Sequence, residues 1–262
     1  MMSTLKTLAA LFVANVRTYA IDKKRLYVMS LAMCLQNTMF FVLWVIFFNH
    51  VGSIRGWDLV DVTRMFGMVA SVCGLSLFFF DGLRTIPYKV SSGAIDFYIT
   101  KPRHPLPAIM LSSSSPASLG DVFYAPTLYL LIQGVLGIPV FTFSMVPLFL
   151  LLTVLSTILF MSTMCILFSL SFWLKGNPRF SGQLFEMLII FSCNVLHGQP
   201  WGVKAVVFTL IPAGFISYLP IELLRHFDWV TFSEIVLATI FYAWLAIFIF
   251  NKGLRRYVRA KA

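Results

Sequence analysis

No charged side chain occurs between Val122 and Leu174, and this run constrains the fold more than any other feature of the sequence. As one helix it would be about 80 Å long, whereas the hydrocarbon core of a bilayer is about 30 Å thick. Gly137, Pro139 and Pro147 interrupt helical structure near the middle of the run. The run therefore predicts two membrane-spanning helices, 122–140 and 147–174, joined by a short turn.

The sequence as a whole is also apolar, since 59% of the 262 residues are hydrophobic and 11% are charged. Soluble domains are about one quarter charged. A further segment, 204–220, is too short to cross a bilayer comfortably, so we expect it to be a re-entrant helix before the last span. The predicted fold is an all-α membrane protein, a single domain over residues 1–262 with six transmembrane helices. Its other four spans are predicted at 26–49, 65–84, 183–200 and 232–251.

The first residues predict a helix on the membrane surface rather than a span. A cleaved signal peptide would need a small, neutral cleavage region, but Asp22–Arg25 is charged. We therefore expect an amphipathic interfacial helix at 3–22. Its apolar residues recur every three or four positions, as on one face of a helix: Leu5, Leu8, Phe12, Val16 and Tyr19.

The distribution of Lys and Arg predicts the orientation. Most of these residues lie in the N-terminal segment, in the C-terminal tail and in the connections after the second and fourth spans. Because basic residues are enriched on the cytoplasmic side, we expect a multi-pass protein of the bacterial inner membrane with both termini in the cytoplasm. We expect no nucleic-acid partner, because no hydrophilic basic domain is present. The basic residues outside these segments are Arg55, Arg64, Lys204 and Arg225.

Reactive side chains form no recognisable catalytic or metal-binding pattern. The four cysteines and four histidines lack the spacing of metal ligands, so we expect no catalytic and no metal-ligating residues. Amides predicted at membrane depth either join helices by hydrogen bonds or line a pathway. The candidates for a translocation path are Gln36, Asn37, Gln133 and Asn194.

The longest predicted cytoplasmic connection, 85–120, is where cytoplasmic machinery can reach the spans. Its centre reads GAIDFYITKP, from Gly93 to Pro102. Ile95 can face the membrane while Asp96 and Lys101 face water, which predicts a short amphipathic helix that ends at proline. Taken alone, the pattern also fits an ordinary surface loop.

This centre resembles the motif G-x-[IL]-D-x-Y-[IL]-x-[KR]-P of one branch of the type-2 ATP-binding-cassette (ABC) exporter permeases. Segments 211–220 and 253–257, which flank the last span, resemble that family as well. The resemblance implies six spans after an amphipathic helix, re-entrant helices before the sixth span, and cytoplasmic loops that dock into ATPase subunits. It implies that the coupling contacts with the partner ATPase are Gly93, Asp96, Tyr98, Lys101, Pro102 and Arg103.

The sequence contains no G-x-x-x-x-G-K-[ST] loop for binding phosphates. We therefore expect the chain to be no enzyme and to bind no cofactor, with ATP used by a separate ABC ATPase subunit. The other implied partners are the lipid bilayer and a second permease chain, either identical or homologous. The predicted function is thus the permease subunit of an ABC exporter.

Two alternatives belong to other classes. A stand-alone secondary transporter or channel would usually couple through intramembrane carboxylates or repeated halves with broken helices. An integral membrane enzyme acting on lipids would need His, Asp, Ser or Cys clustered at one interface. The sequence shows neither an acidic residue clearly in the middle of a span nor such a cluster.

Overall fold

The structure is a computed structural model, and it describes residues 13–14, 23–53, 56–137, 140–174, 177–194 and 200–261. The regular secondary structure of these residues is helical, as the sequence predicts. Apart from Val13 and Ala14, the predicted interfacial helix 3–22 lies outside the described residues.

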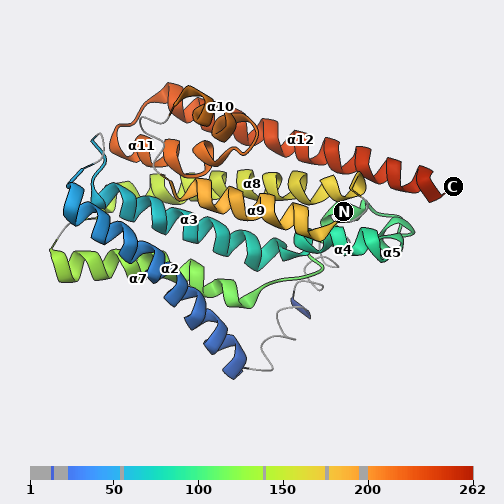
Figure 1. Ribbon diagram of the computed structural model, residues 1–262, viewed down its shortest axis with the longest axis horizontal. Coiled ribbons are helices and arrows are strands. Elements are labelled where there is room, and N and C mark those ends of the chain that lie inside the picture. Colours follow the sequence, from blue (N-terminus) through green and yellow to red (C-terminus); the bar gives the residue numbers. More distant parts are fainter. Residues whose placement is uncertain are drawn as a thin grey trace.

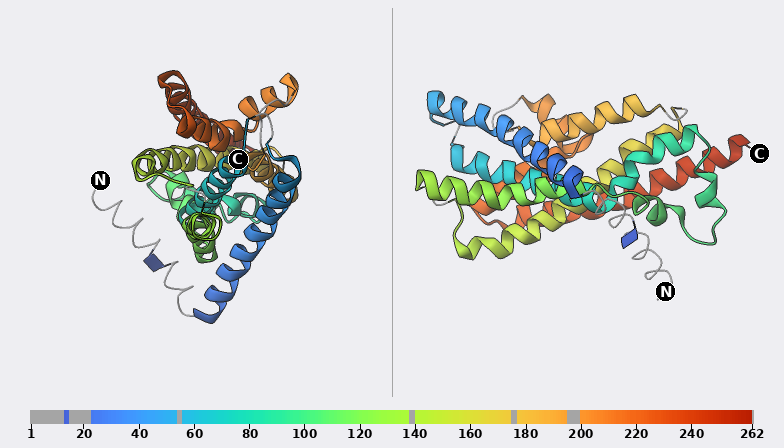
Figure 2. Two further views of the ribbon diagram at one scale, coloured as in Figure 1. Left: turned by 90° about the vertical axis from the view of Figure 1, so that its left-hand side faces the viewer. Right: turned by 90° about the horizontal axis from the view of Figure 1, so that it is seen from below.

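Long helices run between the two ends of an elongated bundle (Figure 1). Figure 2 shows α2 at the edge of this bundle, oblique to the other helices. The long helices are α2 (Lys23–Val51), α3 (Leu59–Phe80), α7 (Leu119–Leu136), α8 (Val146–Ser169), α9 (Pro178–Ser192) and α12 (Trp229–Lys261).

Among the residues that the structure describes, four helical segments are long and apolar enough to cross a membrane, namely Leu26–Val51, Leu59–Ser91, Phe143–Phe172 and Trp229–Ala260. A fifth crossing results if the bent pair Trp201–Thr209 and Gly214–Arg225 forms one broken span. With 18 residues, α7 is about 27 Å long, while the 15 residues of α9 reach about 22 Å. The chain is therefore a multi-pass membrane protein, and the full set of six spans stays a prediction.

α3, α9 and α12 extend several residues beyond the predicted spans at one end. α3 begins at Leu59 rather than 65, because Asp58 and Asp61 form a capping box at its first turn. α9 begins at Pro178 rather than 183, where the Asn177 side chain accepts a hydrogen bond from the Arg179 N–H. α12 continues past 251 to Lys261, so the basic tail of the sequence is helical.

The segment before the last span is also helical, but it is sharply bent. It comprises α10 (Trp201–Thr209), the π-helix η5 (Gly214–Tyr218) and α11 (Leu219–Arg225). The two arms of this segment meet at 82°. Tyr242 of α12 donates a hydrogen bond to the Thr209 carbonyl at the bend, 2.5 Å away. Such a bend fits either a broken span or a re-entrant loop.

α3 forms the centre of the bundle, because small residues allow its neighbours to approach closely. A Cβ at Gly67 would lie 2.0 Å from the Tyr129 hydroxyl, and one at Gly74 would lie 2.8 Å from the backbone nitrogen of Val122. Tyr129 also donates a hydrogen bond to the Arg64 carbonyl. Close packing at small residues is a main source of helix association in membranes, so α3 and α7 pack tightly against each other.

Between α3 and α7 the chain forms several short helices. They are η1 (Asp81–Thr85), α4 (Ile86–Ser91), α5 (Asp96–Ile99), α6 (Pro105–Met110) and η2 (Pro116–Ser118). One of them, α5, lies within the segment from Gly93 to Pro102. Proline lies in the first turn of α4, α6 and η2. Its missing N–H costs nothing there, because backbone N–H groups in the first turn have no partner within the helix. Figure 1 shows α4 and α5 at the same end of the bundle as the C-terminus.

Candidate functional site

The predicted coupling residues lie on and beside α5, at this end of the bundle. Gly93 has φ 74°, a left-handed conformation that glycine adopts without a steric cost, and it turns the chain between α4 and α5. Ile95 is fully buried and joins the hydrophobic core. The segment is therefore held to the bundle through its apolar side chain.

Two lysines lie over aromatic rings of this segment. The Lys101 Nζ lies 4.3 Å from the centre of the Phe97 ring, and the Lys89 Nζ lies 5.3 Å from that of Tyr98. Lys89 also donates hydrogen bonds to Thr85 and to the Ser112 Oγ, the latter 2.8 Å away. The contacts of Lys89 thus hold α4 against α5 and against the turn after α6.

The outer face of the segment carries aromatic and basic side chains. Tyr88 and Phe97 are 68% and 63% exposed. Lys101, Pro102 and Arg103 are also exposed, while Asp96 and Tyr98 are half-buried. Aromatic residues and arginine, such as Tyr88, Phe97 and Arg103 here, are enriched in surfaces that bind another protein. Hereafter we call residues 88–103 the coupling surface.

The residue that follows the coupling surface contacts the last long helix directly. His104, which caps the N-terminus of α6, lies with Nε2 2.8 Å from the Oδ1 of Asn251 in α12. Its ring also lies 6.2 Å from that of Phe250. The chain between α5 and α6 therefore contacts α12 directly.

The four amides predicted for a translocation path are not brought together. Gln36 and Gln133 are exposed on the outside of the bundle. Asn194 lies just after the end of α9 and donates to the carbonyl of Ile190 in that helix, 2.6 Å away. Only Asn37 reaches another helix, since its Nδ2 donates to the Asp121 Oδ1 of α7 at 2.7 Å.

Sequence reasoning missed Asp121 as a buried residue, because it stands at the edge of the long uncharged run. Only 7% of it is exposed. Its surroundings are tightly packed: a Cβ at Gly120 would lie 2.4 Å from the Ser30 carbonyl oxygen, and the Cys34 thiol donates to the Gly120 carbonyl. Gly120, the small residue next to Asp121, is the sequence feature that could have indicated the close approach of α2.

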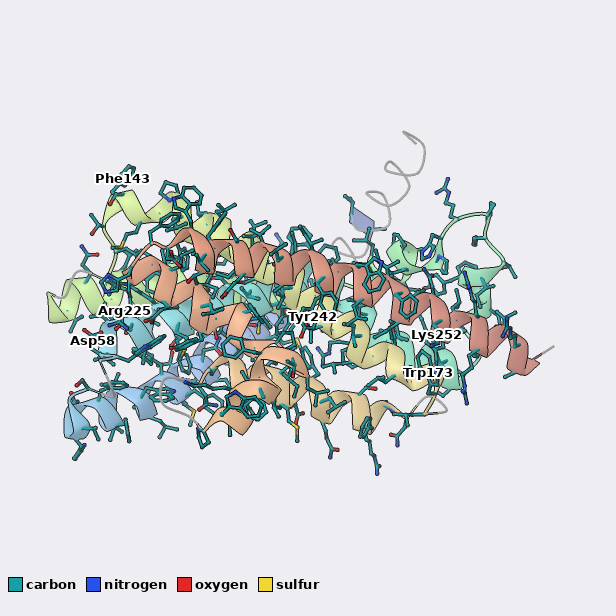
Figure 3. The ribbon with its side chains drawn as sticks, turned by 90° about the horizontal axis from the view of Figure 1, so that it is seen from above. Asp58, Phe143, Trp173, Arg225, Tyr242 and Lys252 are labelled. Atoms are coloured by element: carbon teal, nitrogen blue, oxygen red, sulfur yellow. The ribbon has the colours of Figure 1, made fainter. Side chains whose placement is uncertain are left out.

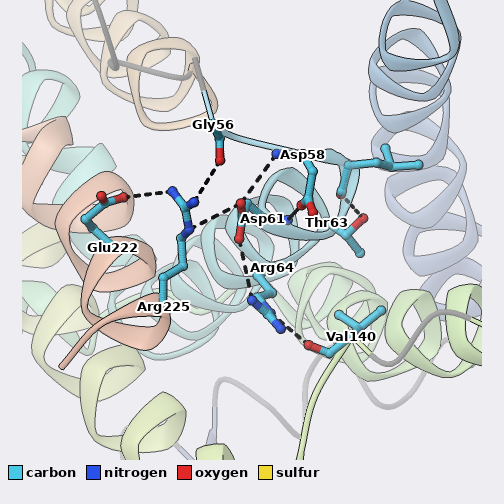
Figure 4. A network of polar contacts seen from close by, with 9 residues as sticks. Gly56, Asp58, Asp61, Thr63, Arg64, Val140, Glu222 and Arg225 are labelled. Atoms are coloured by element: carbon cyan, nitrogen blue, oxygen red, sulfur yellow. Dashed lines mark hydrogen bonds and ion pairs between the residues drawn. The ribbon is translucent and has the colours of Figure 1, made fainter. Parts of the chain in front are cut away.

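A second polar cluster, also unpredicted, lies at the opposite end of the bundle (Figures 3 and 4). The Asp61 carboxylate lies 3.5 Å from Arg64 Nη1 and 3.4 Å from Arg225 Nε. Arg225 also pairs with Glu222, 3.4 Å away. Two of the four basic residues that fell outside the predicted cytoplasmic segments are thus neutralised by carboxylates.

The same arginines also hold two loops at this end. Arg225 donates to the Gly56 carbonyl and Arg64 donates to that of Val140, both at 2.7 Å. Fully buried Trp57 stacks on Tyr218, with ring centres 5.2 Å apart. The cluster therefore fastens the loops before α3 and α8 to the end of the bent segment, and its role is to hold the helices in place.

Within the described ranges, no three His, Cys, Asp or Glu side chains gather in a way that could hold a metal ion. The four cysteines are free thiols.

Comparison with protein families gives one match, to the family described as ABC-2 family transporter protein, over residues 34–260. No curated protein matches the chain, and no solved structure matches it.

Proposed function

The chain belongs to the ABC-2 family of transporter proteins, and from this premise we propose that it is the permease subunit of an ABC exporter. Members of this family form the membrane part of a transporter and are not enzymes in themselves. In the proposed assembly, a separate ATPase subunit hydrolyses ATP and docks on the coupling surface. A second permease chain, identical or homologous, completes the pathway across the membrane.

The coupling surface is the observation that carries this proposal. Its exposed aromatic and basic side chains offer a docking face, while buried Ile95 fixes the segment to the core. The contact between His104 and Asn251 offers a route from that face to α12. A ligand or partner shifts a conformational equilibrium only when it binds two states with different affinity. We propose that ATP-driven closure of the ATPase pair supplies this difference.

The orientation and the finer topology belong to the same proposal. The coupling surface and the C-terminus share one end of the bundle (Figure 1), which we assign to the cytoplasmic side of a bacterial inner membrane. The 82° bend before α12 supports a re-entrant segment. The matching pattern from Gly93 to Pro102 supports the motif-bearing branch of the exporter permeases.

Co-purification from native membranes in mild detergent tests the proposal. We expect an ABC ATPase to accompany the chain. Lys101→Glu should reduce the amount of ATPase recovered, whereas Arg179→Glu, an equal charge change at an exposed residue outside the coupling surface, should not. If no ATPase accompanies the wild-type chain under conditions that preserve its fold, the proposal is wrong.

The pair of Asp121 and Asn37 is the one observation that favours a second candidate, a stand-alone secondary transporter. A buried carboxylate is the group through which such proteins often couple to protons. A chain reconstituted alone into vesicles should then carry protons down an imposed pH gradient, and Asp121→Asn should abolish that flux. Under the ABC permease proposal we expect no flux from either protein.

A further inference from the structure

We propose that a basic groove beside the C-terminal part of α12 binds the phosphate headgroup of an anionic phospholipid from the cytoplasmic leaflet. The lipid's acyl chains then lie along the exposed aromatic side of the same helix. The assignment to this leaflet rests on the orientation given under the proposed function. Lipid binding itself requires neither the ATPase nor transport, so the two proposals can fail separately.

The groove has a volume of about 580 Å³ and a strongly basic lining. Four cations face it from α12, at positions spaced by three, one and three residues, which places them on one side of the helix. Trp173, just after the end of α8, supplies an indole ring. The lining residues are Trp173, Lys252, Arg255, Arg256, Arg259 and Ala260.

Close packing holds the two walls of the groove together. A Cβ at Gly253 would lie 2.5 Å from the Phe172 ring, so glycine allows α12 to approach the 3₁₀ turn η4 (Leu170–Phe172). The Phe172 ring also contacts the rings of Phe250 and Tyr257, with centres 5.7 and 6.3 Å apart. The groove is thus built into the fold, with Trp173 adjoining the buried Phe172.

The groove lacks a protein counter-ion in the part of the chain that the structure describes. The ion pairs of Asp61, Asp81 and Glu222 are made with arginines outside the groove, and none of them involves the four groove cations. Lys252 with Arg256, and Arg255 with Arg259, are like charges four residues apart, an arrangement that destabilises a helix. An anion bound in the groove removes this repulsion.

The helix length places the groove at the level of lipid headgroups. Trp229, which is 71% exposed, begins α12 at the opposite end of the bundle. From Trp229 to Lys252 the helix rises about 34 Å, close to the ~30 Å thickness of the hydrocarbon core. With Trp229 at one interface, where tryptophan is enriched, Lys252 reaches the other. Arg255, Arg256 and Arg259 then lie in the headgroup layer.

An apolar stripe on α12 leads directly into the basic groove. Phe241, Trp244 and Phe248 are exposed, and the last two rings are stacked with centres 5.5 Å apart. The Lys252 Nζ lies 5.8 Å from the centre of the Phe248 ring. A molecule with apolar chains and an anionic headgroup can bind both the aromatic stripe and the basic groove, whereas a soluble anion can bind only the groove. Basic clusters next to a spanning helix attract anionic lipids in this way.

Native mass spectrometry of the isolated full-length chain tests the proposal. The chain is titrated in mild detergent with phosphatidylglycerol, phosphatidylcholine or inorganic phosphate. We expect preferential retention of phosphatidylglycerol. Because each basic residue near an anionic lipid surface contributes about 1 kcal/mol, Arg255→Gln/Arg259→Gln should weaken retention by roughly tenfold or more. The control Lys24→Gln/Arg179→Gln removes two exposed charges elsewhere and should retain the lipid.

Fluorescence gives a second measurement that needs no change to the basic residues. Phosphatidylglycerol with bromine atoms near its headgroup should quench part of the tryptophan emission, and Trp173→Phe should remove that part. Equal retention of phosphatidylcholine, equal retention by the two double variants, or unchanged quenching in Trp173→Phe would overturn the proposal. The proposal would also be wrong if Arg255→Gln/Arg259→Gln retained phosphatidylglycerol but no longer recovered the ATPase. The groove would then bind a protein partner rather than a lipid.

Discussion

Arg225 of α11 lies with its Nε 3.4 Å from the Oδ2 of Asp61 in α3, at the end of the bundle opposite the coupling surface. The carboxylate that Arg225 contacts is almost fully buried and also faces Arg64. This pair fastens the end of the bent segment to the central helix. Because α12 follows directly after α11, the pair also fixes the point from which the last long helix starts.

Asp61→Asn should destabilise the protein, because it leaves two partly buried arginines without their shared carboxylate. Removal of one partner from a largely buried ion pair predicts a loss of about 2 kcal/mol. In a chain of this size, that loss corresponds to a fall of roughly 4–8 °C in the unfolding temperature. Asp58→Asn is the matched control, since asparagine also caps helices. Equal unfolding temperatures for the two variants would contradict the role given to Asp61.

Gly120→Ala should separate α2 from α7, since the added Cβ would meet the backbone oxygen of Ser30. Overpacking of this kind costs about 1–3 kcal/mol. Gly134→Ala, in the same helix, meets no atom within 4 Å. Alanine is a better helix former than glycine, so that variant should be as stable as the wild type or slightly more stable. Thermal unfolding in detergent compares the two, and an equally large loss in Gly134→Ala would refute the packing explanation.

The two sides of the coupling surface should respond differently to truncation. Ile95→Ala removes a fully buried side chain and should cost about 2–4 kcal/mol of stability. Phe97→Ala removes a mostly exposed ring and should change stability by less than about 0.5 kcal/mol.

Recovery of the ATPase provides the second measurement for Phe97→Ala. The proposed docking face predicts less ATPase with this variant, although its unfolding temperature should match that of the wild type. A Phe97→Ala chain that recovers the ATPase in full would remove this ring from the docking face.

Asp228 should make stability depend on pH in the acid range. Its carboxylate accepts hydrogen bonds from the backbone N–H and the hydroxyl of Thr231, at 3.0 and 3.1 Å. The backbone hydrogen bond from Thr231 is the main cause that lowers the pKa of Asp228 below its usual value. The stabilisation is therefore complete above the unfolded-state pKa of about 4 and is lost as the pH falls through the lower, folded-state pKa.

Unfolding temperatures measured between pH 6 and pH 3 check this expectation. Asparagine caps the helix but carries no charge to titrate, so the advantage of the wild type over Asp228→Asn should shrink below about pH 4. A constant difference across the whole range would show that the charge of Asp228 contributes nothing.

Local patterns in the sequence predicted most of the helices and the class of protein. Uncharged runs of sufficient length indicate membrane helices wherever they occur, and Gly93 and the prolines mark turns without reference to distant residues. The helix bounds were less well predicted, because the predicted spans were set by where charged residues occur. The side chains of Asp58 and Asn177 instead cap α3 and α9 several residues earlier. The motif at Gly93–Pro102 was visible because its residues are neighbours in sequence.

The sequence by itself thus determined an apolar, helical chain, together with a short segment that resembles the exporter-permease motif. Only the tertiary structure decided that Asp61 meets Arg225, that Asn37 meets Asp121, and that Trp173 joins the basic side of α12. Each of these contacts joins helices that are distant in the chain, and helix packing fixes which faces meet. The charges in the sequence are compatible with several basic partners for Asp61. Helix packing decides between them, because it brings Arg64 and Arg225 close to this carboxylate.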